Sequence, residues 1–267
     1  MPELAGRTAL ITGVGRREGI GYAVATRLAA MGASLVVQHH LPHDHDQPWG
    51  SDDPEELLQE LTEQVMPGAQ VVQISADLER PGSAAQLIDA ARHQAGHVDI
   101  LACIHARSGG DGRLADIQEE QLDGHWAVDA RSVLMLTKHF ATQHDGRSGG
   151  RVVWMTSGQQ LGPMLGEVAY ASAKAALAGV TATVAEELAE QGIVLNTVNP
   201  GPVNTGFLSP GMGIPEDTLE DLQQRFPTRR FGEPDDPARL IAWLVSDEGR
   251  WMVGQVLNTE GGFRRLG

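Results

Sequence analysis

The sequence predicts an α/β fold: a single doubly wound parallel β-sheet with helices on both faces. Short apolar segments alternate with longer amphipathic ones along the chain. The apolar segments are typical of strands that are buried on both faces, as in parallel sheets. Glycine is abundant, at 32 residues, and much of it lies where an expected strand meets an expected helix. Helices that alternate with such strands cover both faces of the sheet.

The expected elements follow one another in a regular order. Strands are expected at 8–11, 34–38, 70–74, 98–104, 151–156, 193–198 and 255–258. Helices are expected at 19–31, 53–65, 82–94, 119–144, 168–190 and 237–246. Right-handed crossovers between these strands give a Rossmann-type arrangement, in which ligands bind beyond the carboxyl ends of the strands.

The whole chain, 1–267, is expected to form a single domain, since α/β folds of this length are often one unit. Two segments do not fit the alternation. Segment 39–51 is a polar insertion after the second strand, and segment 201–230 is rich in Gly and Pro. We expect segment 201–230 to form a flap near the ligand site.

The composition predicts a cytoplasmic protein. The formal net charge is −15 and the pI is about 5.0, so nucleic acid and anionic membranes are not expected partners. The first residues lack a signal-peptide pattern, and no apolar run reaches the roughly 18 residues of a membrane span. Cys103 is the single cysteine, which excludes an intrachain disulfide and fits a reducing compartment.

A glycine-rich turn follows the first expected strand, with the sequence Thr12-Gly13-Val14-Gly15-Arg16-Arg17-Glu18-Gly19-Ile20-Gly21. Glycine lets backbone N–H groups approach a pyrophosphate, which then lies at the positive end of the next helix. Such a turn can also be purely structural. Its place in the first strand-turn-helix unit favours dinucleotide binding.

The residues near this turn favour NADP over NAD. A site for NAD usually has an acidic residue at the end of the second strand, whereas this chain has Gln38, His39 and His40 there. Arg16 and Arg17 could bind a ribose 2′-phosphate. The alternative is that both arginines are solvated charges at the rim of the site.

Three residues form a candidate catalytic set. Tyr170 and Lys174 are four residues apart on an expected helix, so their side chains share one face. A nearby ammonium lowers the pKa of a phenol, which can then exchange a proton with a carbonyl or an alcohol. Ser157 follows the strand at 151–156, and its hydroxyl could bind the substrate oxygen.

Jointly, these motifs resemble those of the short-chain dehydrogenase/reductase family, in its 3-oxoacyl-carrier-protein reductase-like group. The resemblance extends over essentially the whole chain. The Tyr-to-Lys spacing differs from that of the related enoyl reductases, which place the lysine further along. The matching segments are the turn 12–21, Asp77, the set Ser157, Tyr170 and Lys174, segment 199–205, Gly254-Gln255 and Gly261-Gly262.

The resemblance implies roles for the matching residues. Tyr170 would be the acid/base, Ser157 would orient the substrate oxygen, and Lys174 would bind the nicotinamide ribose and tune Tyr170. Family members are usually homotetramers, packed through two long helices and the last strand. The implied cofactor-binding residues are Gly13, Gly15, Arg16, Arg17, Gly19, Ile20, Gly21, His39, Asp77, Leu78, His105, Tyr170, Lys174, Pro200, Gly201, Val203 and Thr205.

Two positions depart from the family pattern. The family's Asn-Asn-Ala-Gly is here Cys103-Ile104-His105-Ala106, and the family's Asn on the long helix is here Asp129. In the family, that Asn is thought to hold a water that joins the lysine to a proton relay. Asp129 is isosteric with Asn and is therefore included in the candidate catalytic set. Its charge could weaken the effect of Lys174 on Tyr170 or could assist proton exit, and the sequence favours neither.

Other reactive residues have simpler interpretations. The histidines in 39–45 could bind metal, but a polar loop at the adenosine rim is preferred and no metal site is predicted. Cys103 lies in an apolar strand and is expected to be a core residue. His105 and Arg107 either face the substrate cleft or are structural.

The favoured function is an NADP-dependent oxidoreductase that transfers a hydride between NADPH and a carbonyl or secondary alcohol. A 3-oxoacyl thioester is one candidate substrate. An acidic carrier protein would then need a basic patch on this acidic chain, which Arg225, Arg229 and Arg230 could supply. A small ketone, sugar or polyketide intermediate is also plausible. The alternative function is a non-catalytic dinucleotide-binding sensor, motivated by the altered Asn positions.

Overall fold

The computed structural model describes residues 3–212 and 214–265 and confirms the predicted doubly wound sheet. Seven strands pair in the order β3-β2-β1-β4-β5-β6-β7, and every pair is parallel. The winding reverses between β1 and β4, which is where such sheets bind ligands. The strands are β1 (Thr8–Thr12), β2 (Ser34–His39), β3 (Val71–Ser75), β4 (Ile100–Cys103), β5 (Gly150–Met155), β6 (Ile193–Asn199) and β7 (Val256–Asn258).

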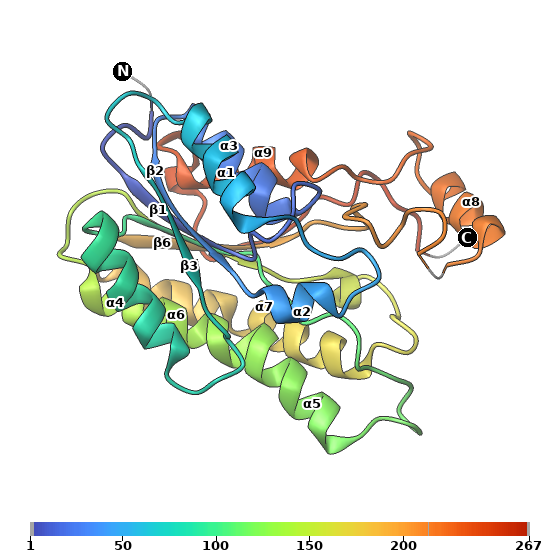
Figure 1. Ribbon diagram of the computed structural model, residues 1–267. Coiled ribbons are helices and arrows are strands. Elements are labelled where there is room, and N and C mark those ends of the chain that lie inside the picture. The colour runs from blue at the N-terminus through green and yellow to red at the C-terminus, as the bar shows by residue number, and fades with distance from the viewer. Residues whose placement is uncertain (1–2, 213, 266–267) are drawn as a thin grey trace.

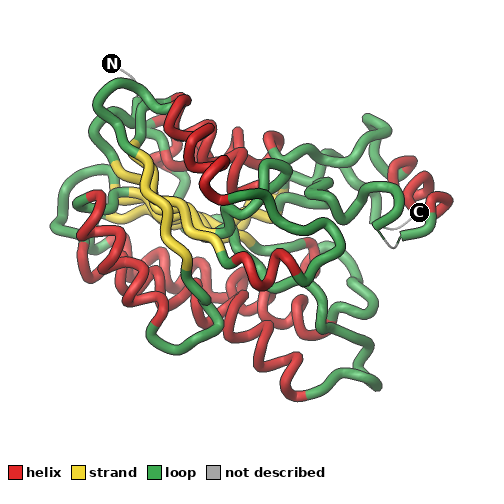
Figure 2. Tube along the Cα trace, viewed as in Figure 1, coloured by secondary structure: helices red, strands yellow, loops and turns green. Residues whose placement is uncertain are grey.

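Helices cover both faces of the sheet (Figure 1). Figure 2 shows the strands between two helical layers, with α1, α3 and α9 on one side and α4, α6 and α7 on the other. The main helices are α1 (Ile20–Ala30), α3 (Pro54–Gln64), α4 (Ser83–Ala95), α5 (Glu119–His125), α6 (Ser132–Gln143), α7 (Val168–Ala189) and α9 (Asp235–Val245). Two shorter helices are α2 (Leu41–His45) and α8 (Glu216–Gln224).

Each central strand contributes side chains to two apolar cores. In β1, Ala9 and Ile11 belong to the core that contains residues of α1 and α9. Leu10 belongs to the opposite core, with residues of α4, α6 and α7. Successive side chains of a strand point to opposite faces of the sheet. A sheet with helices packed on both faces therefore needs apolar residues at every strand position. This explains why the strands are continuous apolar runs rather than alternating ones.

Cys103, at the end of β4, is one of these core residues and is buried. Burial raises the pKa of its thiol, which keeps the sulfur protonated and unreactive. This agrees with its interpretation from the sequence.

Helix α7 is, within the described residues, the one helix long and apolar enough to cross a membrane. Its side chains Ala173, Leu177 and Leu188 are buried, and the helix packs against β6. Both properties are those of a core helix.

The predicted helix at 119–144 is helical from 119 to 143 but not uniform. Between α5 and α6 the chain forms a π-helix, Trp126–Arg131. Asp129 lies in this π-helix and is fully buried. π-Turns are rare within helices and occur frequently at functional sites.

The two irregular segments of the sequence also contain helices. Segment 39–51 includes α2, which lies close to the carboxyl edge of the sheet (Figure 1). Segment 201–230 includes α8, which projects away from the sheet. A small apolar cluster of its own, including Leu208, Leu219 and Phe226, holds this segment together.

Candidate active site

The turn between β1 and α1 requires glycine at two positions. Gly13 has φ of +76°, and a Cβ there would lie 2.8 Å from the Cα of His105. A Cβ on Gly21 would lie 2.3 Å from the carbonyl oxygen of Gly13. These contacts bring the turn against both the start of α1 and the end of β4. The backbone is therefore compact enough for a pyrophosphate to approach the helix N-terminus.

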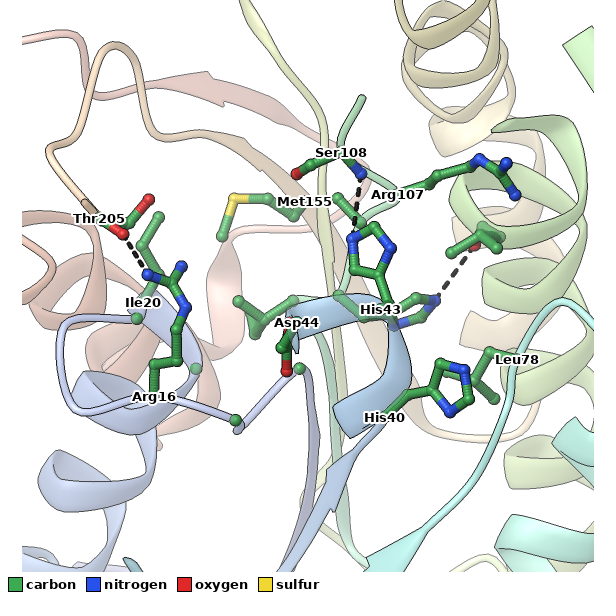
Figure 3. Close-up of a pocket in the computed structure, with 18 of the residues that line it drawn as sticks. Arg16, Ile20, His40, His43, Asp44, Leu78, Arg107, Ser108, Met155 and Thr205 are labelled. Atoms are coloured by element: carbon green, nitrogen blue, oxygen red, sulfur yellow. Dashed lines mark hydrogen bonds between the residues drawn. The ribbon is translucent and has the colours of Figure 1, made fainter. Parts of the chain in front are cut away.

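A cavity of about 520 Å³ opens beyond the carboxyl ends of the central strands (Figure 3). Its size is in the ordinary range for small-molecule sites. The cavity extends from the glycine turn to Tyr170. The predicted residues that line it are Gly13, Gly15, Arg16, Gly19, Ile20, Gly21, Asp77, Leu78, His105, Ser157, Tyr170, Lys174, Pro200, Gly201 and Thr205.

Four other candidate residues, Arg17, His39, Val203 and Asp129, do not line this cavity. His39 is buried at the end of β2. Val203 forms an isolated bridge with Gly232. Asp129 lies behind Lys174, within the protein.

Arg17 is held by carboxylates outside the cavity. Its guanidinium lies 2.7 Å from Asp52, 2.6 Å from Glu60 and 3.1 Å from Glu56. Hydrogen bonds to Glu60 and then Glu56 raise the pKa of Arg17. Arg16 is therefore the arginine of the turn that is available to a ligand in the cavity.

Arg16 and helix α2 form one side of the cavity; the sequence favoured a polar loop at the adenosine rim for segment 39–45 and did not predict a helix there. The Arg16 guanidinium donates to the carbonyl oxygen of Thr205 and lies 5.5 Å from the centre of the Trp49 ring. Figure 3 shows Asp44 between Arg16 and His43 in this view. Burial raises the pKa of the Asp44 carboxyl. His43 accepts a hydrogen bond from the backbone N–H of Ser108, at 3.2 Å.

The end of β2 presents amide and imidazole groups. Gln38 is buried, accepts a hydrogen bond from the Gly13 N–H at 3.1 Å and donates to Ala76 at 2.8 Å. His40 lines the cavity. In the part of the chain that the structure describes, no group of three or more His, Cys, Asp or Glu residues is placed to hold a metal ion.

The candidate catalytic residues converge from β5 and α7. Lys174 is 1% exposed, and its Nζ donates to the carbonyl oxygen of Met155 at 3.2 Å. The same Nζ lies 5.6 Å from the centre of the Tyr170 ring. Ser157 follows β5 and lines the cavity together with Tyr170 and Lys174.

Asp111 positions the first turn of α7. Its carboxylate accepts hydrogen bonds from the backbone N–H groups of Ala169, at 2.9 Å, and Tyr170, at 2.8 Å. These donors have no partner within the helix, and a carboxylate there also interacts favourably with the helix dipole. The sequence reasoning missed Asp111, because it is far from Tyr170 along the chain and fits no local capping pattern.

The Tyr170 phenol is held in its protonated form. Burial, followed by the charge of Asp129, raises the pKa of Tyr170, and a hydrogen bond with Ser157 opposes the rise. From the sequence, a lowered pKa beside Lys174 was expected. The structure differs because desolvation penalises the phenolate and Asp129 adds a negative charge nearby. A protonated phenol is a proton donor at neutral pH.

Asp129 contacts three groups within the protein. Its Oδ1 lies 3.6 Å from Nζ of Lys174 and accepts a hydrogen bond from the Arg107 N–H at 2.9 Å. Its Oδ2 lies 2.8 Å from Nδ1 of His125. The sequence considered a pair with Lys174 but did not include His125.

His105 is a neutral structural histidine that also reaches the cavity wall. Burial, and then the charge of Lys174, lowers the pKa of His105 to about 4. Its Nδ1 lies 2.6 Å from Oγ1 of Thr12, and its Nε2 lies 2.7 Å from Oγ of Ser132. These contacts tie β1 to the start of α6 directly beneath the glycine turn.

Comparison with known proteins identifies the family. The family model described as "Enoyl-(Acyl carrier protein) reductase" matches residues 13–264. The uncharacterized oxidoreductase YjdA of Bacillus subtilis is 35% identical over 97% of both chains. This chain belongs to the short-chain dehydrogenase/reductase family.

Two further members of the family are informative about the cofactor. The NADPH-dependent aldehyde reductase-like protein of Arabidopsis thaliana is 30% identical, over 97% of this chain and 95% of that protein. The solved 3-oxoacyl-(acyl-carrier-protein) reductase of Agrobacterium tumefaciens, with NADP bound, has a TM-score of 0.84 and 26% identity, over 97% of this chain and 95% of that chain. The protein is an oxidoreductase of this family, and the family uses NAD(P).

Proposed function

We propose that this protein is an NADP-dependent carbonyl reductase that uses Tyr170 as the proton donor. The observation that carries the proposal is the meeting of Tyr170, Lys174 and Ser157 in the cavity that begins at the glycine turn. The raised pKa of Tyr170 favours carbonyl reduction, because that direction consumes a proton from the phenol.

Each residue has one task in this mechanism. The dinucleotide, when bound on the glycine turn, supplies the hydride for the carbonyl carbon. Ser157 Oγ donates a hydrogen bond to the substrate oxygen and orients it. Tyr170 gives its phenolic proton to the same oxygen. Lys174 stabilises the phenolate that remains, since an opposite charge nearby favours an ionised group.

The preference for NADP rests on Arg16 and on the end of β2. Gln38, His39 and His40 offer no carboxylate to the ribose hydroxyls, and Arg16 and His40 both line the cavity. The NADPH-dependent relative and the NADP-bound structural neighbour support the same choice. Arg17 does not contact the bound NADP in this proposal, because its carboxylate partners hold the guanidinium outside the cavity.

The cofactor preference is tested by measuring the affinities for NADPH and NADH. We expect Arg16→Ala to weaken NADPH binding about tenfold while leaving NADH binding close to that of the wild type, because the arginine would contact only the 2′-phosphate. Arg17→Ala is the matched control and should leave the NADPH-to-NADH ratio unchanged. A wild-type preference for NADH would contradict the assignment.

We propose a free carbonyl compound with an apolar body as the substrate. Leu161 and Leu165, in the segment between Ser157 and Tyr170, are 43% and 83% exposed, and Phe207 is 46% exposed. Two of the three arginines considered for a carrier protein have acidic partners. Arg225 lies 2.7 Å from Asp221, and Arg230 lies 2.6 Å from Asp236. These pairs weaken the case for a basic docking patch.

A panel of ketones, aldehydes and 3-oxoacyl thioesters with NADPH tests this proposal. We expect turnover of free ketones or aldehydes with apolar groups. Turnover restricted to carrier-bound thioesters would overturn the substrate class. Tight NADPH binding without turnover of any carbonyl would instead favour the dinucleotide sensor.

We also propose a cytoplasmic homotetramer, in keeping with the oligomers that this family commonly forms.

A further inference from the structure

The loop that begins at Ser157 contains two glycines. We call residues 157–162 the serine loop, and its glycines are Gly158 and Gly162. The Leu161 N–H donates to the carbonyl oxygen of Gly158 at 2.9 Å. This hydrogen bond shapes a tight turn, but it is internal to the loop. The position of the loop relative to the sheet therefore depends also on contacts with other segments.

Arg265, near the end of the chain, packs directly on the serine loop. A Cβ on Gly158 would collide with Nη2 and Cζ of Arg265, and a Cβ on Gly162 would lie 2.9 Å from its Cδ. For both glycines, the three atoms nearest to such a Cβ all belong to Arg265. The guanidinium thus lies on the residue next to Ser157, and the aliphatic part of the side chain lies on the other end of the loop.

An ion pair holds the Arg265 guanidinium in this place. The guanidinium donates to the Glu260 carboxylate through Nε, at 3.3 Å, and also through Nη2. The Glu260 side chain is 9% exposed and that of Arg265 is 16% exposed. The same carboxylate accepts a hydrogen bond from Nδ2 of Asn199, at the end of β6, at 2.9 Å. A bidentate arginine–carboxylate pair has a defined geometry, so Arg265 links the serine loop to the carboxyl edge of the sheet.

The backbone from which Arg265 extends is also held. The Arg264 N–H donates to the carbonyl oxygen of Arg225, in the flap segment, at 3.1 Å. The Phe263 ring lies 4.9 Å from the ring of Phe226, between ring centres. These contacts fix the chain on the side away from the serine loop. The Arg265 side chain is therefore a bridge between two anchored segments.

We propose that Arg265 is a positioning residue that aligns Ser157 with the substrate oxygen. The proposal rests on the proposed function, in which Ser157 donates a hydrogen bond to that oxygen. Ser157 lines the cavity, whereas Arg265 is not among the residues that line it. Arg265 therefore acts through the serine loop and not on the substrate. Without the guanidinium, the loop loses its link to Glu260, and a poorly aligned donor stabilises the developing charge less.

The first test reads the position of Ser157 in crystal structures of the wild type and of Arg265→Ala, without substrate. We expect the serine loop of the variant to shift by about 1 Å or more, or to lose defined density, because nothing replaces the guanidinium on Gly158. A serine loop that superposes on that of the wild type, with Ser157 in the same rotamer, overturns the proposal. This measurement needs no turnover, so it decides the proposal even if every carbonyl in the panel fails and the proposed function is lost.

The second test follows carbonyl reduction with NADPH. We expect Arg265→Ala to lower kcat/KM for the carbonyl about tenfold and to leave the Kd for NADPH within about twofold of the wild type, because the serine loop moves and the glycine turn does not. Arg264→Ala is the matched control, since it removes the same charge from an exposed neighbour. It should behave as the wild type. An equal loss in both variants, or no loss in Arg265→Ala, overturns the proposal.

A double variant with Ser157→Ala distinguishes positioning from a general loss of stability. Ser157→Ala alone should lower kcat/KM about 100-fold, and Arg265→Ala should add less than about twofold in that background, because the hydroxyl that it aligns is already missing. A full tenfold effect of Arg265→Ala without the Ser157 hydroxyl, by contrast, overturns the proposal.

A second double variant tests the contact on Gly158. Gly158→Ala should displace the guanidinium and reproduce the loss seen in Arg265→Ala. Because both changes break the same contact, the combination should cost no more than either change alone. Wild-type kinetics in Gly158→Ala, or losses that multiply in the double variant, would contradict the role of this contact.

Discussion

At the scale of single residues, the candidate catalytic set combines groups whose charges depend on one another. Burial penalises ionisation of Tyr170, and Asp129 adds to this penalty. A hydrogen bond with Ser157 acts in the opposite direction, and Lys174 lies 3.6 Å from Asp129. The Tyr170 phenol is therefore protonated over a wide pH range. This arrangement suits a reductase, which needs a proton donor rather than a base in its resting state.

The pH dependence of carbonyl reduction follows from this raised pKa. The protonated phenol persists above the usual pKa of tyrosine, so kcat/KM for reduction should stay high through neutral pH and fall only under alkaline conditions. Tyr170→Phe should reduce it at least about 100-fold and retain NADPH binding, since only the proton donor is lost. Tyr22→Phe, which removes a hydroxyl that donates to Glu60 at 2.8 Å, is the control. An equal loss in both variants would refute the role of Tyr170.

At the scale of elements, the site depends on contacts between segments that are distant along the chain. The Asp111 carboxylate holds the first turn of α7, and the π-helix holds Asp129 behind Lys174. His105 connects the end of β1 to the start of α6. Of these contacts, those of Asp111 hold the backbone of Tyr170 itself.

Removal of the Asp111 carboxylate should loosen the start of α7. We expect Asp111→Ala to lower the free energy of unfolding by about 1–2 kcal/mol, because two backbone N–H groups lose their acceptor. The reduction rate should also fall, since Tyr170 is one of the two residues held. Asp116→Ala is the control, because Asp116 is exposed in the same loop. Thermal unfolding and steady-state kinetics measure both effects, and equal melting temperatures for the two variants would contradict the prediction.

At the scale of the whole molecule, exposed apolar side chains occur on the proposed packing surfaces. Trp251, just before β7, is 95% exposed, and Trp126 in the π-helix is 47% exposed. Met135 on α6 and Val180 on α7 are each 36% exposed. Exposed large apolar residues are costly unless a partner covers them, so these surfaces favour a symmetric oligomer.

Light scattering tests this assembly. Wild-type protein should have the mass of a tetramer. Trp251→Lys should shift the mass towards smaller species, because a buried charge replaces a large apolar contact. Met66→Lys, a similar change after α3 and away from β7, should leave the mass unchanged. A monomeric wild type would contradict the proposed tetramer.

The sequence by itself determined the sheet, the order of its elements and many of the residues around the cavity. Buried parallel strands need continuous apolar runs, a phosphate-binding turn needs glycine, and Tyr170 and Lys174 share a helix face by spacing alone. These are local properties, so they can be predicted from the sequence alone.

Only the tertiary structure decided which charges meet. Arg17 is adjacent to Arg16 in the chain, yet carboxylates from segment 52–60 hold it outside the cavity. Asp111 and His125 enter the site through contacts that no local sequence pattern predicts. Burial also reversed the expected direction of the Tyr170 pKa. Desolvation and long-range pairing depend on the packing of distant segments, so they become visible only when the chain is folded.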